Sequence, residues 1–224
     1  MQILKSISPC ILFFFFTTAC KEHSTRAIQA ANPDTIYIHD TIPVLKPVDD
    51  WQKGFGLTHD PEADSIWFKP VSYYINDKNC SGLAVDFYYG RLRPSDDGAT
   101  TELLKLAATG NDKLRPFYRW CLNKTILVQD GALAELTGIP ARIYAEKFPN
   151  EFFAYMDIDS SGEKINDWIA AIAYSGFYDE DDHKNATAIR KRFSNTMISH
   201  CYSCDKKMLE RIDSFATRCF LNAK

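Results

Sequence analysis

The clearest pattern along the chain is an apolar residue at every third or fourth position, and it recurs in three segments. In residues 114–126, seven such positions fall on one helical face: Leu114, Phe117, Tyr118, Cys121, Leu122, Thr125 and Ile126. Residues 165–173 and 208–220 repeat this spacing. A period near 3.6 is typical of a helix that packs one face on a core, so all three segments are predicted to be helical.

Start and stop signals predict further helices between these segments. Residues 60–62 (Asp-Pro-Glu) are a typical helix opening, and Pro70 interrupts soon after it, which predicts two short helices. Pro140 and Pro149 are each expected to open another short helix, because proline suits the first helical turn. Helices are also predicted for residues 81–92, 97–108 and 185–200.

Strand patterns are scarce in the same chain. Only residues 35–42 alternate and are rich in β-branched side chains, as a strand would be. The chain shows no repeat of fixed length. We therefore predict an all-α domain over residues 51–224, either a multi-helix antiparallel bundle or an irregular two-layer helical array.

The first twenty residues have a different character. Residues 1–8 carry one cation, Lys5, and residues 11–16 (ILFFFF) are apolar without interruption. A bilayer span takes about 20 residues, so this run is too short to cross a membrane and is typical of the apolar part of a signal peptide.

Residues 17–20 (Thr-Thr-Ala-Cys) resemble the lipobox of bacterial lipoproteins, in which small residues precede an obligatory cysteine. This chain has Thr17 where the family prefers Leu. The resemblance implies that residues 1–19 are a signal peptide removed before Cys20, and that the Cys20 thiol carries a diacylglycerol group. Two or three acyl chains hold a protein to a membrane far more firmly than a single chain. Lys21 stands where an Asp would signal inner-membrane retention, so the outer membrane is favoured, with the leaflet left open.

Residues 20–50 are predicted to be a tether between the lipid and the helical domain. They contain three prolines and no helical period. Residues 35–42 within them either pair as a strand or belong to an extended arm, and the composition favours the arm.

Composition and charge narrow the class of partner. Hydrophobic residues make up 46% of the chain, enough for a core. The 26 Lys and Arg residues are balanced by 29 Asp and Glu residues, and no basic stripe is present. A nucleic-acid partner is therefore not expected.

Five cysteines follow Cys20, and export would place them where disulfides form. Residues 200–204 (His-Cys-Tyr-Ser-Cys) lack the preceding strand of a thioredoxin-like motif and the second ligand pair of a zinc site. A local disulfide between Cys201 and Cys204 remains, as does pairing of one of them with Cys80. The other two, Cys121 and Cys219, lie on apolar helix faces and are expected to be buried.

Two acidic segments are candidate cation sites. Residues 157–162 (DIDSSG) resemble the first half of an EF-hand loop, with oxygen ligands at Asp157, Asp159 and Ser161. Trp168 stands where that loop needs a bidentate Glu, so these three residues are weak metal candidates, and a polar turn that caps the next helix is favoured. The acidic run 179–182 is expected to be a solvated loop before a helix. Neither a resident metal nor a cofactor is expected.

The sequence contains neither a Gly-x-Ser-x-Gly nucleophile elbow nor a His-Glu-x-x-His helix, two signs of hydrolytic chemistry. The leading hypothesis is a lipid-anchored, non-catalytic protein of the cell envelope. It would be held to the membrane through Cys20 and bind an unidentified protein. One version of this hypothesis is an immunity protein, a comparison that rests on analogy of fold alone. The alternative is an envelope hydrolase that uses carboxylates of residues 157–159 and 179–182.

Overall fold

The computed structural model describes residues 51–54, 65–109, 111–180 and 185–221. The chain divides into two units, residues 1–44 and 45–224, and every described residue belongs to the second. The tether of residues 20–50, its strand candidate at 35–42 and the helix opening at residues 60–62 lie outside the described residues.

Among the described residues, the regular secondary structure is helical apart from one two-stranded hairpin, which confirms the all-α prediction. The elements are α1 (Trp51–Gly54), β1 (Ser65–Ile66), β2 (Lys69–Pro70), α2 (Ser72–Ile75), α3 (Gly82–Tyr88), α4 (Gly98–Thr109), α5 (Arg115–Val128), α6 (Gly131–Lys147), α7 (Pro149–Met156), α8 (Glu163–Ser175), α9 (Ala186–Ser199) and α10 (Lys206–Leu221). Within these residues, no helix combines the length and apolar character needed to cross a bilayer.

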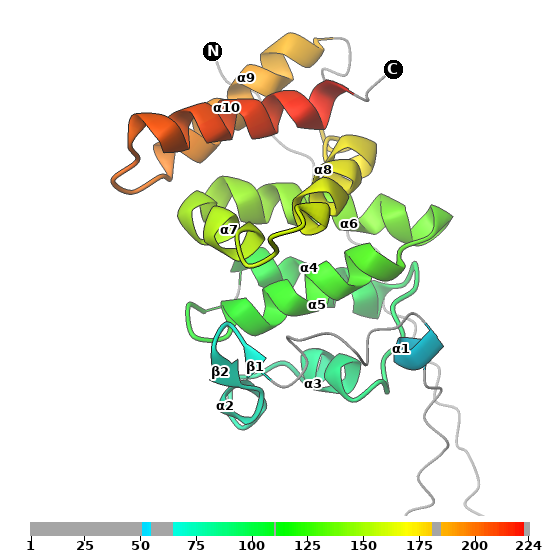
Figure 1. Ribbon diagram of the computed structural model, residues 1–224. Helices are drawn as coiled ribbons and strands as arrows, with labels where there is room; N and C mark the ends of the chain where they lie inside the picture. The colour runs from blue at the N-terminus through cyan, green and yellow to red at the C-terminus, as the bar shows by residue number, and fades with distance from the viewer. Residues whose placement is uncertain (1–50, 55–64, 110, 181–184, 222–224) are drawn as a thin grey trace, which may run out of the picture. The chain divides into compact units, whose positions relative to one another are not determined.

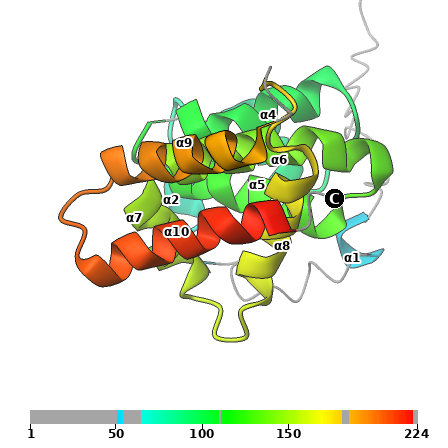
Figure 2. The same cartoon turned by 90° about the horizontal axis from the view of Figure 1, so that it is seen from above.

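The helices are arranged around α6, which packs against α4, α5, α7, α8 and α9. In Figure 1 the paired helices α9 and α10 lie at the top, above α8 and α6, and the view from above in Figure 2 shows them side by side. The α3 helix and the β1–β2 hairpin lie at the opposite end and pack against α5.

The α5 helix is buried on all sides. Its polar side chains therefore lie in the core together with its apolar ones. Twelve of its fourteen residues are buried, among them Arg119, Asn123 and Lys124. The Oδ1 atom of Asn123 accepts a hydrogen bond of 2.8 Å from the indole Nε1 of Trp168 on α8. Burial lowers the pKa of the Lys124 ammonium to about 7, because the charged form loses its hydration there.

The α6 and α8 helices cross in close contact at Gly138. A Cβ atom at Gly138 would overlap the backbone of Gly176 and Ala171 and the hydroxyl of Ser175. That hydroxyl accepts from the Gly138 N–H (3.1 Å) and donates to the Ala134 carbonyl (2.7 Å). These two groups are four residues apart on α6, so Ser175 bridges one turn of the neighbouring helix.

The prediction that Pro140 opens a helix is wrong, because α6 begins nine residues earlier and contains Pro140. Proline lacks an N–H and leaves the carbonyl four residues before it without its usual donor, which normally ends a helix. Here packing against five helices and the Ser175 bridge support the segment from outside. The prediction for Pro149 is confirmed, since it begins α7.

The β1–β2 hairpin was not predicted. It pairs Ser65 with Pro70 and Ile66 with Lys69 in antiparallel register. Pro70 does interrupt the chain, as predicted, but it ends a strand where a helix was expected.

We predict that Gly138→Ala destabilises the domain by about 3 kcal/mol or more, because the methyl group must displace backbone atoms of α8. Gly131→Ala, at the start of the same helix, is the matched control. A Cβ there has nothing within 4 Å, so its stability should change little or rise slightly. Denaturant unfolding of both variants measures the difference. Equal stabilities would show that the α6–α8 crossing adjusts freely.

Candidate functional site

The 157–162 loop joins α7 to α8 and is held by hydrogen bonds of its own. Asp159 accepts from the Ser161 hydroxyl (2.7 Å), the Ser161 N–H (2.9 Å) and the Lys164 N–H (2.8 Å). These bonds stabilise the carboxylate and lower the pKa of Asp159 to about 2. Asp159 therefore orders the first turn of α8, as the polar-turn interpretation expects.

Asp157 faces a different partner. Its carboxylate accepts from both terminal nitrogens of Arg211 on α10, with Nη1 at 2.9 Å from Oδ2. The Arg211 guanidinium also lies over the Phe153 ring, 4.4 Å from its centroid. The hydrogen bonds from Arg211 lower the pKa of Asp157, so this carboxylate links the end of α7 to α10.

The described part of the second acidic segment surrounds Arg142 of α6. The Arg142 Nη2 donates to Asp179 (2.6 Å), and Nη1 approaches Glu180 (3.4 Å) and Glu146 (3.3 Å). Glu180 also pairs with Arg192 on α9. Asp181 and Asp182 lie outside the described residues.

The structure does not bring the described acids of the two segments together. Asp157 and Asp159 precede α8, whereas Asp179 and Glu180 follow it, and a 13-residue helix is about 20 Å long. Among the described residues, no three His, Cys, Asp or Glu side chains are grouped as a metal ion would require.

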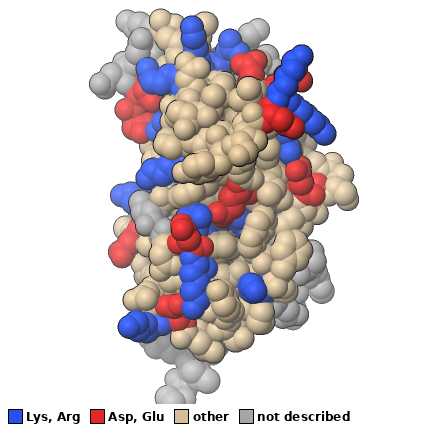
Figure 3. Space-filling view, turned by 90° about the vertical axis from the view of Figure 1, so that its left-hand side faces the viewer, with Lys and Arg blue, Asp and Glu red and all other residues tan. Residues whose placement is uncertain are grey.

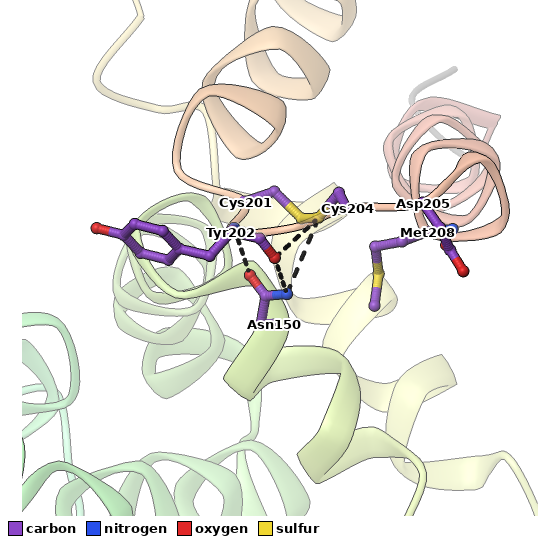
Figure 4. The surroundings of a disulfide bond; sticks show 6 residues. All are labelled: Asn150, Cys201, Tyr202, Cys204, Asp205 and Met208. Atoms are coloured by element: carbon purple, nitrogen blue, oxygen red, sulfur yellow. Dashed lines mark hydrogen bonds between the residues drawn. A yellow bond between two sulfur atoms is a disulfide. The ribbon is translucent and has the colours of Figure 1, made fainter.

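Cys201 and Cys204 form the local disulfide, with Cα atoms 5.8 Å apart, in the turn between α9 and α10. Figure 4 shows how Asn150 of α7 holds this turn. The Asn150 amide donates to the Tyr202 carbonyl (3.1 Å) and accepts from the Tyr202 N–H (3.0 Å). The Tyr202 side chain points away and is 85% exposed. The disulfide therefore closes a turn that α7 fixes in place.

The alternative pairing with Cys80 is not formed. Cys80 lies just before α3, half-buried, with a free thiol. Cys121 and Cys219 are buried with free thiols, as predicted, and burial raises the pKa of both. Cys20 lies outside the described residues.

The turn of the β1–β2 hairpin is strained. Trp67 and Phe68 occupy its two central positions, with φ of 49° and 62°. Such turns normally carry Asn-Gly, since a positive φ costs a residue with a side chain about 1–3 kcal/mol. The backbone strain at these two residues offsets a substantial part of the 5–15 kcal/mol that is the typical free energy of unfolding of a domain.

Contacts with the core hold the hairpin in this conformation. Ile66 is fully buried, and its carbonyl accepts a hydrogen bond of 2.8 Å from the Tyr74 hydroxyl. The Trp67 ring lies 4.4 Å from the guanidinium of buried Arg119, which in turn lies 3.8 Å from the Tyr155 ring. Phe68 is left outside, 79% exposed.

Two lysines lie over an aromatic ring beside the hairpin. The Tyr73 ring lies beneath the Nζ of Lys69, at 5.7 Å, and the Nζ of Lys113, at 4.8 Å. Lys113 also pairs with Asp77 at 2.6 Å, and Tyr73 is 42% exposed. We call Phe68, Lys69, Tyr73 and Lys113 the hairpin surface.

A second exposed aromatic area lies where α8 ends, beside α9 and α10. A cavity of about 200 Å³ is lined there by Tyr174, Phe177, Tyr178, Ile189, Cys219 and Phe220. The Tyr174 and Tyr178 rings are 6.2 Å apart, and about half of each side chain is exposed. We call this the tyrosine cavity. In Figure 1, α8–α10 lie in the upper part and the hairpin lies at the lower end.

Charges are mixed on the face shown in Figure 3. Blue and red side chains are interspersed there, and neither sign occupies one broad area. This face therefore carries no single-sign field that would attract a polyanion.

We predict that calcium at tens of micromolar does not stabilise the protein. The 157–162 loop lacks the bidentate Glu of an EF-hand, and the Asp157 carboxylate is already hydrogen-bonded to Arg211. A site of this kind should bind calcium with a dissociation constant in the millimolar range or weaker. The melting temperature should then rise by less than about 0.5 °C. A clear rise that Asp157→Ala abolishes would contradict this prediction.

Comparisons of this chain with protein-family models, with curated proteins and with solved structures find no match.

Proposed function

We propose that this protein is a lipid-anchored, non-catalytic component of the cell envelope whose helical domain binds a protein partner. The anchor rests on the sequence of residues 17–20 and on Cys20 in particular. The acyl chains would hold the protein to the membrane, with the outer membrane favoured by Lys21. The binding role rests on the described domain.

The tyrosine cavity is the observation that carries the binding role. Its volume of about 200 Å³ is below the 300–1,000 Å³ typical of cofactor and small-molecule sites, but it suits one large side chain. Tyr174 and Tyr178 belong to its lining and are each about half exposed, and tyrosine is enriched among residues that dominate protein–protein binding energy. This arrangement fits a projecting apolar side chain of another protein.

The alternative, an envelope hydrolase, requires carboxylates of the 157–159 and 179–182 segments to converge on a substrate. Asp159 caps α8, Asp157 pairs with Arg211, and Asp179 pairs with Arg142. These pairs lie at the two ends of α8, which favours structural roles for the acids and supports the binding hypothesis.

We predict that Cys20→Ser abolishes the incorporation of labelled fatty acid and moves the protein out of the membrane fraction. Without the thiol, no thioether to diacylglycerol can form. Cys10→Ser is the matched control, because it removes a cysteine from the same signal segment and should leave labelling unchanged. Labelling that persists in Cys20→Ser would show that the lipid is attached elsewhere or that another anchor exists.

We predict that a photo-reactive phenylalanine analogue at position 178 captures one defined envelope protein in cells. The same analogue at position 191, on an exposed part of α9, should not capture it. Binding of the identified protein to the double variant Tyr174→Ala, Tyr178→Ala should weaken about 30-fold or more, the loss expected for hot-spot residues.

The controls separate binding from folding. Both tyrosines are half exposed, so the double variant should keep the circular dichroism spectrum of the parent protein. Equal capture from positions 178 and 191, or unchanged affinity in the double variant, would contradict the tyrosine cavity as the binding site.

A further inference from the structure

The hairpin surface combines a projecting aromatic side chain with lysines, and this combination separates two kinds of partner. Phe68 is 79% exposed, and Lys69 and Lys113 both lie over the Tyr73 ring. Lysine is depleted in protein–protein interfaces. At the membrane–water interface, aromatic rings lie at headgroup level and lysine ammonium groups approach lipid phosphates. The residue types therefore favour a lipid surface.

The charges at this end agree with that choice. Asp77 neutralises one of the two lysines through its ion pair with Lys113, which leaves the hairpin surface with one net positive charge. A bacterial membrane presents anionic phosphates, so the net charge attracts the hairpin surface toward the headgroups. The tyrosine cavity has no lysine in its lining, which sets the two aromatic areas apart.

The chain enters the described domain at α1, in the lower part of Figure 1 where the hairpin also lies. Trp51 of α1 packs on Phe87 of α3, with ring centroids 5.3 Å apart, and Gln52 donates to the Phe87 carbonyl (2.8 Å). In Figure 1, α1 and α3 lie in the lower part together with the hairpin, with α1 at the right and the hairpin at the left. The end of the domain that meets the preceding chain therefore also carries Phe68.

The length of that chain limits how far this end can lie from the membrane. Trp51 follows Cys20 by 31 residues, and a chain of that length spans at most roughly 110 Å. Attachment at Cys20 would make contact between domain and bilayer an intramolecular event with a high effective concentration. Burial of one phenylalanine ring, which favours the contact about ten- to a hundred-fold, is then sufficient to populate it.

We propose that the hairpin surface lies in the headgroup region of the membrane, with Phe68 inserted between lipids and Lys69 facing their phosphates. This inference rests on the proposed lipid anchor at Cys20. It adds a second membrane contact that orients the domain and leaves the tyrosine cavity at the other end for a protein partner. The strained turn then has a purpose, since it holds one bulky apolar side chain away from the domain.

The test uses the full chain in cells grown with labelled phospholipid precursor. A photo-reactive phenylalanine analogue placed at position 68 should yield a labelled lipid adduct. The same analogue at position 202, which is equally exposed but lies in the α9–α10 turn, should yield at least fivefold less. With the analogue at position 73, Phe68→Ser and Lys69→Glu should each reduce the lipid adduct several-fold, and neither exposed substitution should alter the circular dichroism spectrum.

Each result decides the inference. A protein adduct in place of lipid at position 68 would overturn it in favour of a second protein-binding area. Equal lipid adducts at positions 68 and 202 would overturn it too, because the hairpin would then show no preference for lipid. Fatty-acid labelling of Cys20 in the same cells separates this inference from the anchor. Labelled Cys20 without a lipid adduct at position 68 overturns only the hairpin contact. A lipid adduct at position 68 without label on Cys20 overturns only the anchor.

Discussion

The absence of a side chain at Gly138 is the constraint on which the arrangement of the helices depends. It lets α6 approach α8 closely enough for the Ser175 hydroxyl to bridge Gly138 and Ala134. Since α6 also packs against α4, α5, α7 and α9, the position of this crossing sets the position of most other helices. The tyrosine cavity lies just beyond it, where α8 ends.

Much of the fold could be predicted because local patterns and tertiary packing agree. The three-and-four spacing in residues 208–220 marks the face of α10 that the structure buries. The same spacing in residues 114–126 falls on α5, whose other sides are buried as well. The prediction failed where packing overrides local preference, since five neighbouring helices support α6 across Pro140. The hairpin gives no local signal, because Trp67-Phe68 contains none of the residues that normally mark a tight turn.

The candidate sites were predictable only where they are local in sequence. The Cys201–Cys204 disulfide closes four consecutive residues, a pairing that the sequence offered beside one with Cys80. Asp159 accepts from an N–H of the helix that begins four residues later, as a polar turn before that helix would. The tyrosine cavity joins residues of α8 to Phe220 of α10, and the partner of Asp157 is 54 positions away. Such contacts depend on how helices meet, which periodicity does not describe.

The strained hairpin places stability and the proposed membrane contact in opposition. Replacing Trp67-Phe68 by Asn-Gly would suit the positive φ angles and remove the backbone penalty, although it would also remove the ring that lies against Arg119. Replacing Phe68 alone by glycine keeps that ring and relieves the turn. A selection for heat resistance alone would therefore favour glycine at this position. The resulting domain would be harder to unfold and would have lost its proposed hold on the bilayer surface.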